Sequence, residues 1–284
     1  MNAIELSHIN KSFGDFAIRD LNLTVPSGTI CGLVGENGAG KSTTIRLLMG
    51  ALQPDSGTAS VLGVDVTSPE FREVKEDVGV VLDEAYFPES LNAAQVGKIM
   101  AATYCQWDQK LYDSYLKRFD LPEKKQFKDF SRGMRMKLAI AVALSHQPKL
   151  LVLDEATAGL DPIVRDEVLD IFNEFTREED HSILISSHIL SDLEKLCDYI
   201  AFIHKGDLLF CEEKDRLLEQ YGIFEDSKEN LDCLQPEAIV AREETRYGGV
   251  RALVKRDLAP AGFQLEKPSV EDIVLFLVKG AKRR

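Results

Sequence analysis

A glycine-rich segment, GENGAGKS, spans residues 35–42 and is the feature that most constrains how this chain folds. It matches the spacing G-x-x-x-x-G-K-[ST] at Gly35, Gly40, Lys41 and Ser42. In such a loop the backbone N–H groups point at phosphate oxygens, the lysine reaches the β- and γ-phosphates, and the serine hydroxyl ligates Mg²⁺. An ordinary glycine turn is the alternative, but it requires neither the apolar strand before this loop nor the helix that begins near Lys41. The sequence therefore predicts a phosphate-binding loop between a strand and a helix.

The residues of this loop that we expect to bind the nucleotide share one short stretch of backbone around the phosphates. They are Gly35, Asn37, Gly38, Ala39, Gly40, Lys41, Ser42 and Thr43. The positive end of the following helix adds to the attraction for phosphate.

Two adjacent carboxylates, Asp154 and Glu155, follow the apolar run LLVL. A phosphate-binding loop needs a carboxylate on a neighbouring strand to hold Mg²⁺, and Asp154 ends such a strand. Glu155 is suited to accept a proton from an attacking water, because an ordinary glutamate is ionised at neutral pH. The alternative is that the pair only caps the following turn.

Strands alternate with helices along much of the chain, which predicts a parallel sheet. KLLVLD and SILISS are predicted buried strands, and a helix between them begins at Pro162 with Asp161 as its cap. We expect Ser68 to cap another helix that begins at Pro69. A helical insertion is expected at about residues 86–146, and DYIAFIHKGDLLFCEE is predicted to form a hairpin. After about residue 215 we expect an irregular acidic stretch, a short strand RALVKR and a helix PSVEDIVLFLVKG.

Composition excludes several classes of protein. The net charge of −13 disfavours a nucleic-acid backbone as the main partner. No apolar run approaches the ~20 residues that cross a bilayer, and the beginning of the sequence has no secretory pattern. Five scattered cysteines favour a reducing compartment without a disulfide framework.

Further motifs make the sequence resemble the ATP-binding subunits of ABC transporters. LVLDEATAGLD resembles the second nucleotide motif and the D-loop with Asp161, and ISSH resembles the switch loop with His188. KSFGD places Phe13 where the family stacks an aromatic ring on adenine. DFSRGMRMKL stands at the signature motif, with Ser131 and Gly133 expected to contact phosphate. Taken singly, a histidine after a strand, a core phenylalanine or an aspartate cap has a structural explanation.

The resemblance implies a P-loop NTPase (RecA-like) α/β fold with a parallel-sheet core. It also implies an N-terminal antiparallel β subdomain, an inserted α-helical subdomain at about 86–146 and a small C-terminal α+β extension. The ATP-binding domain would cover residues 1–215 and the extension residues 216–284. ATP and Mg²⁺ are the implied cofactors; Lys41, Glu155 and His188 are the implied catalytic residues, and Ser42, Asp83 and Asp154 the implied metal ligands.

The implied partners are a second copy, arranged head to tail so that two subunits sandwich two nucleotides, and a separate transmembrane permease. This places the chain in the cytoplasm, at the inner face of the membrane through the permease. SRGM and the terminal PSVEDI segment resemble the ATPases of bacterial ABC-2-type exporters of antimicrobial peptides or drugs.

Four residues, in three segments of the chain, depart from the common family pattern. Arg132 replaces the first glycine of the signature pair and Met134 its glutamine; Asp83 stands where a glutamine usually ligates Mg²⁺, and Ala156 replaces a proline. We expect Arg132 either to face solvent or to add charge near the phosphates. Asp83 is able to ligate Mg²⁺ as well as a glutamine does, but it adds a negative charge beside Asp154 and Glu155.

Two other functions compete with a transport motor. A soluble ABC ATPase in translation or DNA maintenance usually carries two ATPase halves or a long coiled coil, and neither is present. A P-loop kinase or GTPase would make the signature and switch motifs coincidences.

Overall fold

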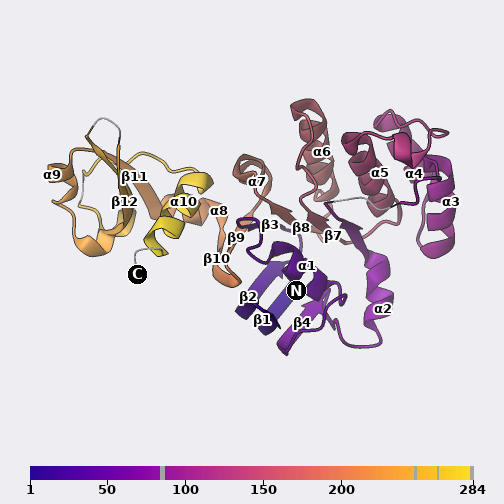
Figure 1. The fold of residues 1–284 in the computed structure, drawn as a ribbon, viewed down its shortest axis with the longest axis horizontal. Helices are drawn as coiled ribbons and strands as arrows, with labels where there is room; N and C mark the ends of the chain where they lie inside the picture. The colour runs from indigo at the N-terminus through magenta and orange to yellow at the C-terminus, as the bar shows by residue number, and fades with distance from the viewer. Residues whose placement is uncertain (84–86, 246–247, 261, 282–284) are drawn as a thin grey trace.

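The computed structural model describes residues 1–83, 87–245, 248–260 and 262–281 (Figure 1). Its centre is a six-stranded sheet in the order β10-β9-β3-β8-β7-β6. The strands are β3 (Ile30–Val34), β6 (Val78–Val81), β7 (Leu150–Asp154), β8 (Ser182–Ser187), β9 (Tyr199–His204) and β10 (Asp207–Glu213). Neighbouring strands are parallel except β10, which pairs antiparallel with β9. The predicted parallel sheet and the predicted hairpin are therefore confirmed.

A second sheet, in the order β2-β1-β4-β5, comes from the N-terminal part of the chain. It contains β1 (Asn2–Phe13), β2 (Phe16–Pro26), β4 (Ser56–Val61) and β5 (Val64–Asp65), all paired antiparallel. Alternate residues such as Ile4, Leu6 and Leu23 point into a buried cluster shared with Leu33 of β3 and Ile45 of α1 (Lys41–Leu48). The expected antiparallel N-terminal subdomain is present, and it packs beneath the phosphate-loop helix.

The helical insertion contains α3 (Ala93–Thr103), α4 (Gln109–Arg118) and α5 (Arg132–Ser145). These helices form one end of the molecule in Figure 1. Their shared core includes Tyr112, Leu116 and Phe127, and it continues into the sheet through residues such as Leu153. α6 (Pro162–Phe175) follows β7, and α7 (Leu190–Leu196) follows β8. In the ranges that the structure describes, no helix combines the length and apolar character needed to cross a bilayer.

One of the two predicted helix caps is confirmed and the other is wrong. Asp161 Oδ1 accepts a hydrogen bond from Val164 N at 3.1 Å, and Pro162 is the first residue of α6. Ser68, however, does not begin a helix, because α2 spans Phe71–Val74 and follows Glu70. The N–H of Phe71 donates to the backbone carbonyl oxygen of Ser68 at 3.2 Å, so the Ser68 hydroxyl does not cap the helix.

The C-terminal part contains a third sheet in the order β11-β13-β12. Its elements are α8 (Lys214–Gln220), β11 (Tyr221–Asp226), α9 (Lys228–Leu231), β12 (Ile239–Glu244), β13 (Val250–Lys255) and α10 (Val270–Ala281). The expected strand and final helix are confirmed, but the expected irregular stretch contains two further strands and two short helices. The acidic residues obscured them, because β12 has only Ala241 fully buried among its six positions. Short 3₁₀ segments are Lys75–Asp77, Phe127–Asp129, Pro236–Ala238 and Arg256–Leu258.

Candidate active site

The carboxyl ends of β3, β7 and β8 meet at one edge of the central sheet, because the three strands are parallel neighbours. A pocket of about 450 Å³ opens there. Its lining residues are Phe16, Glu36, Asn37, Gly38, Gly40, Lys41, Ser42, Thr43, Asp83 and Glu155. Most of the phosphate-loop residues expected from the sequence therefore share one hollow with Asp83 and Glu155.

Glycine is required at two positions of the loop. A Cβ at Gly35 would lie 2.5 Å from the carbonyl oxygen of Ile203, and Gly40 has a φ of +119°. The loop is also fastened to the hairpin between β9 and β10, since Gly206 N donates to Ala39 O at 2.9 Å. The same Gly206 accepts a hydrogen bond from Arg19 N at 3.1 Å. These contacts fix a sharp backbone curl whose N–H groups are available to an anion.

Lys41 is the first residue of α1, and only 6% of its surface is exposed. Its ammonium donates to Gly35 O at 2.8 Å and lies 3.2 Å from Glu155 Oε1. A buried ammonium needs such partners, because its unpaired charge would be costly away from water. The lysine is thus held at the curled loop, beside the adjacent carboxylates Asp154 and Glu155, which we call the acidic doublet.

The acidic doublet is held mainly by a serine of the neighbouring strand. Ser186 Oγ donates to Asp154 Oδ1 at 2.6 Å, and the backbone N–H of Glu155 donates to the same Oγ at 3.1 Å. Glu155 has a φ of +52°, so the chain turns sharply at the end of β7. His188 then approaches from the loop after β8, with Nδ1 2.7 Å from Glu155 Oε2. Lys41 and His188 each contact a different oxygen of one carboxylate.

Ser186 was missed in the sequence analysis although it holds both acids. Its signal is weak, because β8 has the sequence SILISS and Ser182 and Ser187 are serines of the same strand. The position becomes informative only with the sheet register, in which Asp154 of β7 pairs with Ser186 of β8.

The expected adenine-stacking residue, Phe13, is 42% exposed and lies outside the residues that line the pocket. Phe16, its partner across the β1–β2 hairpin, lines the pocket instead and packs against Gly40. Of these two phenylalanines, Phe16 is therefore the one that lines the pocket.

Ser131, Gly133 and Asp161 also lie outside the pocket lining. Ser131 caps α5, where its Oγ accepts from Met134 N at 3.2 Å, and Asp161 caps α6. A Cβ at Gly133 would meet one side-chain atom at 3.8 Å, so the backbone there is open. These three residues of one chain do not converge on its own phosphate loop.

Arg132 neither points freely into solvent nor lines the phosphate pocket. Its Nη2 lies 2.9 Å from Asp83 Oδ1, and both side chains are about half exposed. Two of the four departures from the family pattern, Arg132 and Asp83, therefore touch each other.

Comparisons with known proteins place the chain in a family. Residues 18–158 match the family model described as ABC transporter. The bacitracin transport ATP-binding protein BcrA of Bacillus licheniformis is 37% identical over 209 residues, which cover 72% of this chain and 68% of that protein. The lantibiotic transport ATP-binding protein SrtF of Streptococcus pyogenes is 34% identical over 215 residues, covering 75% and 91%. A solved structure of an ATP binding subunit of an ABC transporter superposes with a TM-score of 0.69 at 27% identity, covering 77% of this chain and 92% of that one.

The chain belongs to the ABC transporter family. It is an ATP-binding subunit and an ATPase. The family resemblance and the P-loop NTPase fold predicted from the sequence are confirmed.

The oxygen atoms near the ABC phosphate loop suit a hard cation such as Mg²⁺. Ser42 and Asp83 line the pocket, and Asp154 is 6% exposed with its Oδ1 engaged by Ser186. Mg²⁺ accepts one or two protein carboxylates and fills the remaining positions with water and substrate phosphates. Among the residues that the structure describes, no group of three or more His, Cys, Asp or Glu side chains is placed to hold a metal ion.

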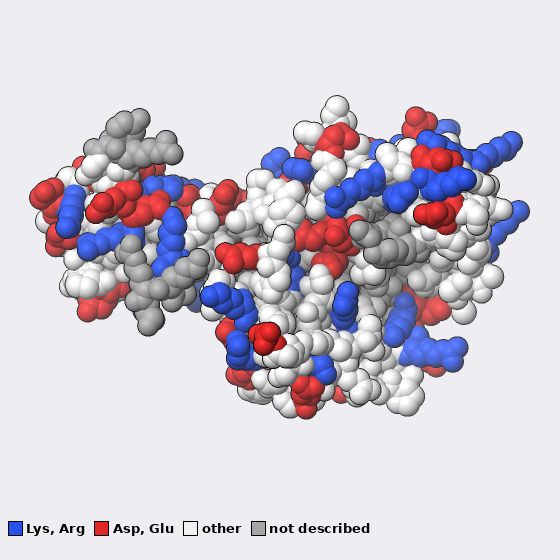
Figure 2. All heavy atoms as spheres, in the orientation of Figure 1, with Lys and Arg blue, Asp and Glu red and all other residues white. Residues whose placement is uncertain are grey.

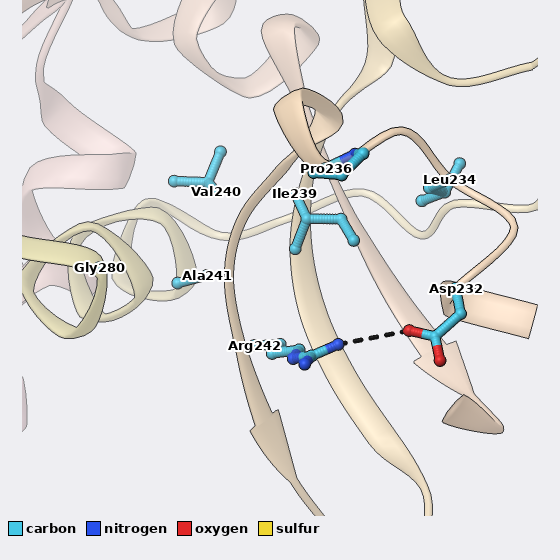
Figure 3. Close-up of a pocket in the computed structure, with 8 residues that line it drawn as sticks. All are labelled: Asp232, Leu234, Pro236, Ile239, Val240, Ala241, Arg242 and Gly280. Carbon is cyan, nitrogen blue, oxygen red and sulfur yellow. Dashed lines mark hydrogen bonds and ion pairs between the residues drawn. The ribbon is translucent and has the colours of Figure 1, made fainter. Parts of the chain in front are cut away.

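Another hollow of this ABC ATPase, of about 630 Å³, lies in the C-terminal part (Figure 3). It is bordered by Val240, Arg242 and Gly280, and Arg242 Nη1 lies 3.4 Å from Asp232 Oδ1. This hollow contains none of the predicted site residues. Over the face shown in Figure 2, acidic and basic side chains are interspersed.

Proposed function

We propose that this chain is the ATP-hydrolysing motor subunit of a bacterial ABC exporter. The observation that carries the proposal is the cluster of Lys41, Glu155 and His188 at the phosphate loop. Residues 1–215 would form the ATP-binding domain and residues 216–284 an extension. The similarity to ATP-binding proteins of bacitracin and lantibiotic transport supports peptides or drugs as the cargo.

Each group of the cluster has a role that follows from its position. Lys41 binds phosphate oxygens and replaces the water that a free triphosphate would hold. The loop N–H groups and the beginning of α1 bind the same phosphates. Mg²⁺, held by Ser42, Asp154 and Asp83, would supply positive charge that offsets the developing charge on the phosphate oxygens.

Glu155 accepts the proton of the attacking water, and His188 orients the carboxylate through its Nδ1 contact. Ser186 keeps Asp154 and the Glu155 backbone in place. His188 would also contact the terminal phosphate, because the loop that carries it begins at the same sheet edge.

We propose a head-to-tail dimer because one chain carries both halves of an ATP site on separate surfaces. Ser131 and Gly133 begin α5, a helix of 14 residues whose open N-terminal N–H groups suit a phosphate. In a dimer they would face the nucleotide on the partner's phosphate loop, with Asp161 beside the seam. Closure on ATP and reopening after hydrolysis would then drive a separate permease.

Permease helices would dock between the 80–87 loop and the helical insertion, which would hold the chain at the inner face of the membrane. Residues 84–86 of that loop lie outside the described residues.

The dimer is tested with Glu155→Gln, a variant that should bind ATP without hydrolysing it. Size-exclusion chromatography with light scattering should show a mass of 31.7 kDa without nucleotide and about twice that mass with Mg-ATP. Adding Ser131→Arg should keep the protein monomeric, because a bulky cation at the cap would block the seam. A mass that stays monomeric with ATP contradicts the dimer, and sedimentation with ribosomes or DNA instead of membranes contradicts the exporter.

A further inference from the structure

The Asp83–Arg132 ion pair joins two segments that are 49 residues apart in the sequence. Asp83 follows β6 and lines the phosphate pocket. Arg132 is the first residue of α5 and directly follows the cap Ser131. The pair therefore connects the rim of the nucleotide pocket to the beginning of the signature helix.

The Arg132 guanidinium also touches the loop that carries the catalytic carboxylate. A Cβ at Gly159 would lie 2.7 Å from Nη1 and 2.9 Å from Cζ of Arg132. Gly159 lies between Glu155 and Asp161, and its φ is +69°. The absence of a side chain at this position gives the guanidinium the space that it occupies.

Charge explains why the two departures occur together. Asp83 adds a carboxylate to a pocket that already contains Glu155 and lies close to Asp154, and ATP itself is strongly anionic. A guanidinium bonded to one oxygen of Asp83 offsets this charge and leaves the second oxygen free. Hydrogen-bonded partners of this kind commonly orient carboxylates that ligate metals.

We propose that Arg132 is a positioning residue for the ATPase site. By holding Asp83, it neutralises the extra carboxylate at the nucleotide pocket and ties that pocket to the signature helix and the Gly159 loop. The inference rests on the proposed assignment of this pocket to the ATP phosphates.

A double-mutant cycle tests the Asp83–Arg132 pair, with the Kd for ATP measured by calorimetry. The buffer contains EDTA, so that no metal ion neutralises the Asp83 carboxylate. Arg132→Ala should raise the Kd by about two- to fivefold, since half-exposed charges interact by up to about 1 kcal/mol. Adding Asp83→Asn to this variant should return the Kd to within about twofold of the wild type. Arg132→Lys, which keeps the charge, should remain close to the wild type.

The Lys137–Glu167 pair provides a matched control, because Lys137 lies on the same helix and its ammonium is 2.7 Å from the carboxylate. Lys137→Ala should leave the Kd for ATP unchanged. If Arg132→Ala does not raise the Kd, or if Asp83→Asn does not restore it, the inference about Arg132 is wrong. The assignment of the pocket to the ATP phosphates is not affected by that result. A wild-type protein that binds no ATP would overturn the pocket assignment and this inference with it.

Discussion

The ammonium nitrogen of Lys41 lies 3.2 Å from the carboxylate oxygen Oε1 of Glu155. Both side chains are largely buried, with 6% and 13% of their surfaces exposed. The residue proposed to bind phosphate and the residue proposed to activate water therefore also neutralise each other. A substitution of Lys41 therefore leaves the charge of Glu155 without its partner, and a substitution of Glu155 does the same to Lys41. Each substitution also removes the proposed role of the residue that is replaced.

Lys41→Ala should lower ATP hydrolysis by about 10²-fold or more, because it removes the charged group that we propose to contact the phosphates. It should also lower the free energy of unfolding by about 1–3 kcal/mol, since Glu155 loses a partner in a buried position. Phosphate release and thermal unfolding measure the two effects. Lys149→Ala, at an exposed position before β7, is the control, and undiminished hydrolysis in Lys41→Ala would refute the assigned role.

Glu155→Gln should lower kcat by about 10²–10⁴-fold, the usual contribution of a positioned general base. The Kd for ATP should stay the same or fall a few-fold, because the amide occupies the same volume, removes one negative charge and leaves Lys41 free for phosphate. Single-turnover hydrolysis and equilibrium binding separate the two quantities. Glu178→Gln, on the exposed segment after α6, should match the wild type, and normal turnover in Glu155→Gln would exclude Glu155 as the base.

Acid should destabilise the helical insertion through His146, which is 1% exposed and lies at the end of α5. Burial lowers the pKa of this imidazole below its ordinary value of 6.5, although contacts with the carbonyl oxygens of Val142 and Val78 act in the opposite direction. Below pH 6.5 the unfolded chain therefore binds more protons than the folded one, and stability falls as the pH falls.

Chemical denaturation between pH 7.5 and pH 5 checks this effect, with a slope from one such group of up to about 1.4 kcal/mol per pH unit. His146→Gln should show a shallower loss over the acidic range than the wild type. Equal pH profiles for the two proteins would show that this histidine does not contribute.

The features that the sequence predicted correctly are those formed by residues close together in the chain. The phosphate loop, the strand before the acidic doublet and the Asp161 cap each depend on residues close together in the chain. The alternation of strands and helices also predicted the parallel sheet. Such features follow from backbone geometry and from short-range hydrogen bonding.

What the sequence did not reveal depends on register and on contacts between distant segments. Ser186 matters because β8 lies beside β7 with Asp154 opposite it, and Phe16 lines the pocket because of its place in the β1–β2 hairpin. The Asp83–Arg132 contact requires the helical insertion to fold back onto the end of β6. Ser68 is not a cap because the N–H of Phe71 donates to the backbone carbonyl oxygen of Ser68 and not to its hydroxyl.

The contact between Gly206 and Ala39 has a consequence for how the protein is made. A nascent chain that has emerged only through α7 already contains every phosphate-loop residue, but not the hairpin that fastens the loop. During translation the loop therefore stays unfastened until Gly206 has left the ribosome. Premature termination before that hairpin would yield fragments with an intact loop sequence and no finished binding site.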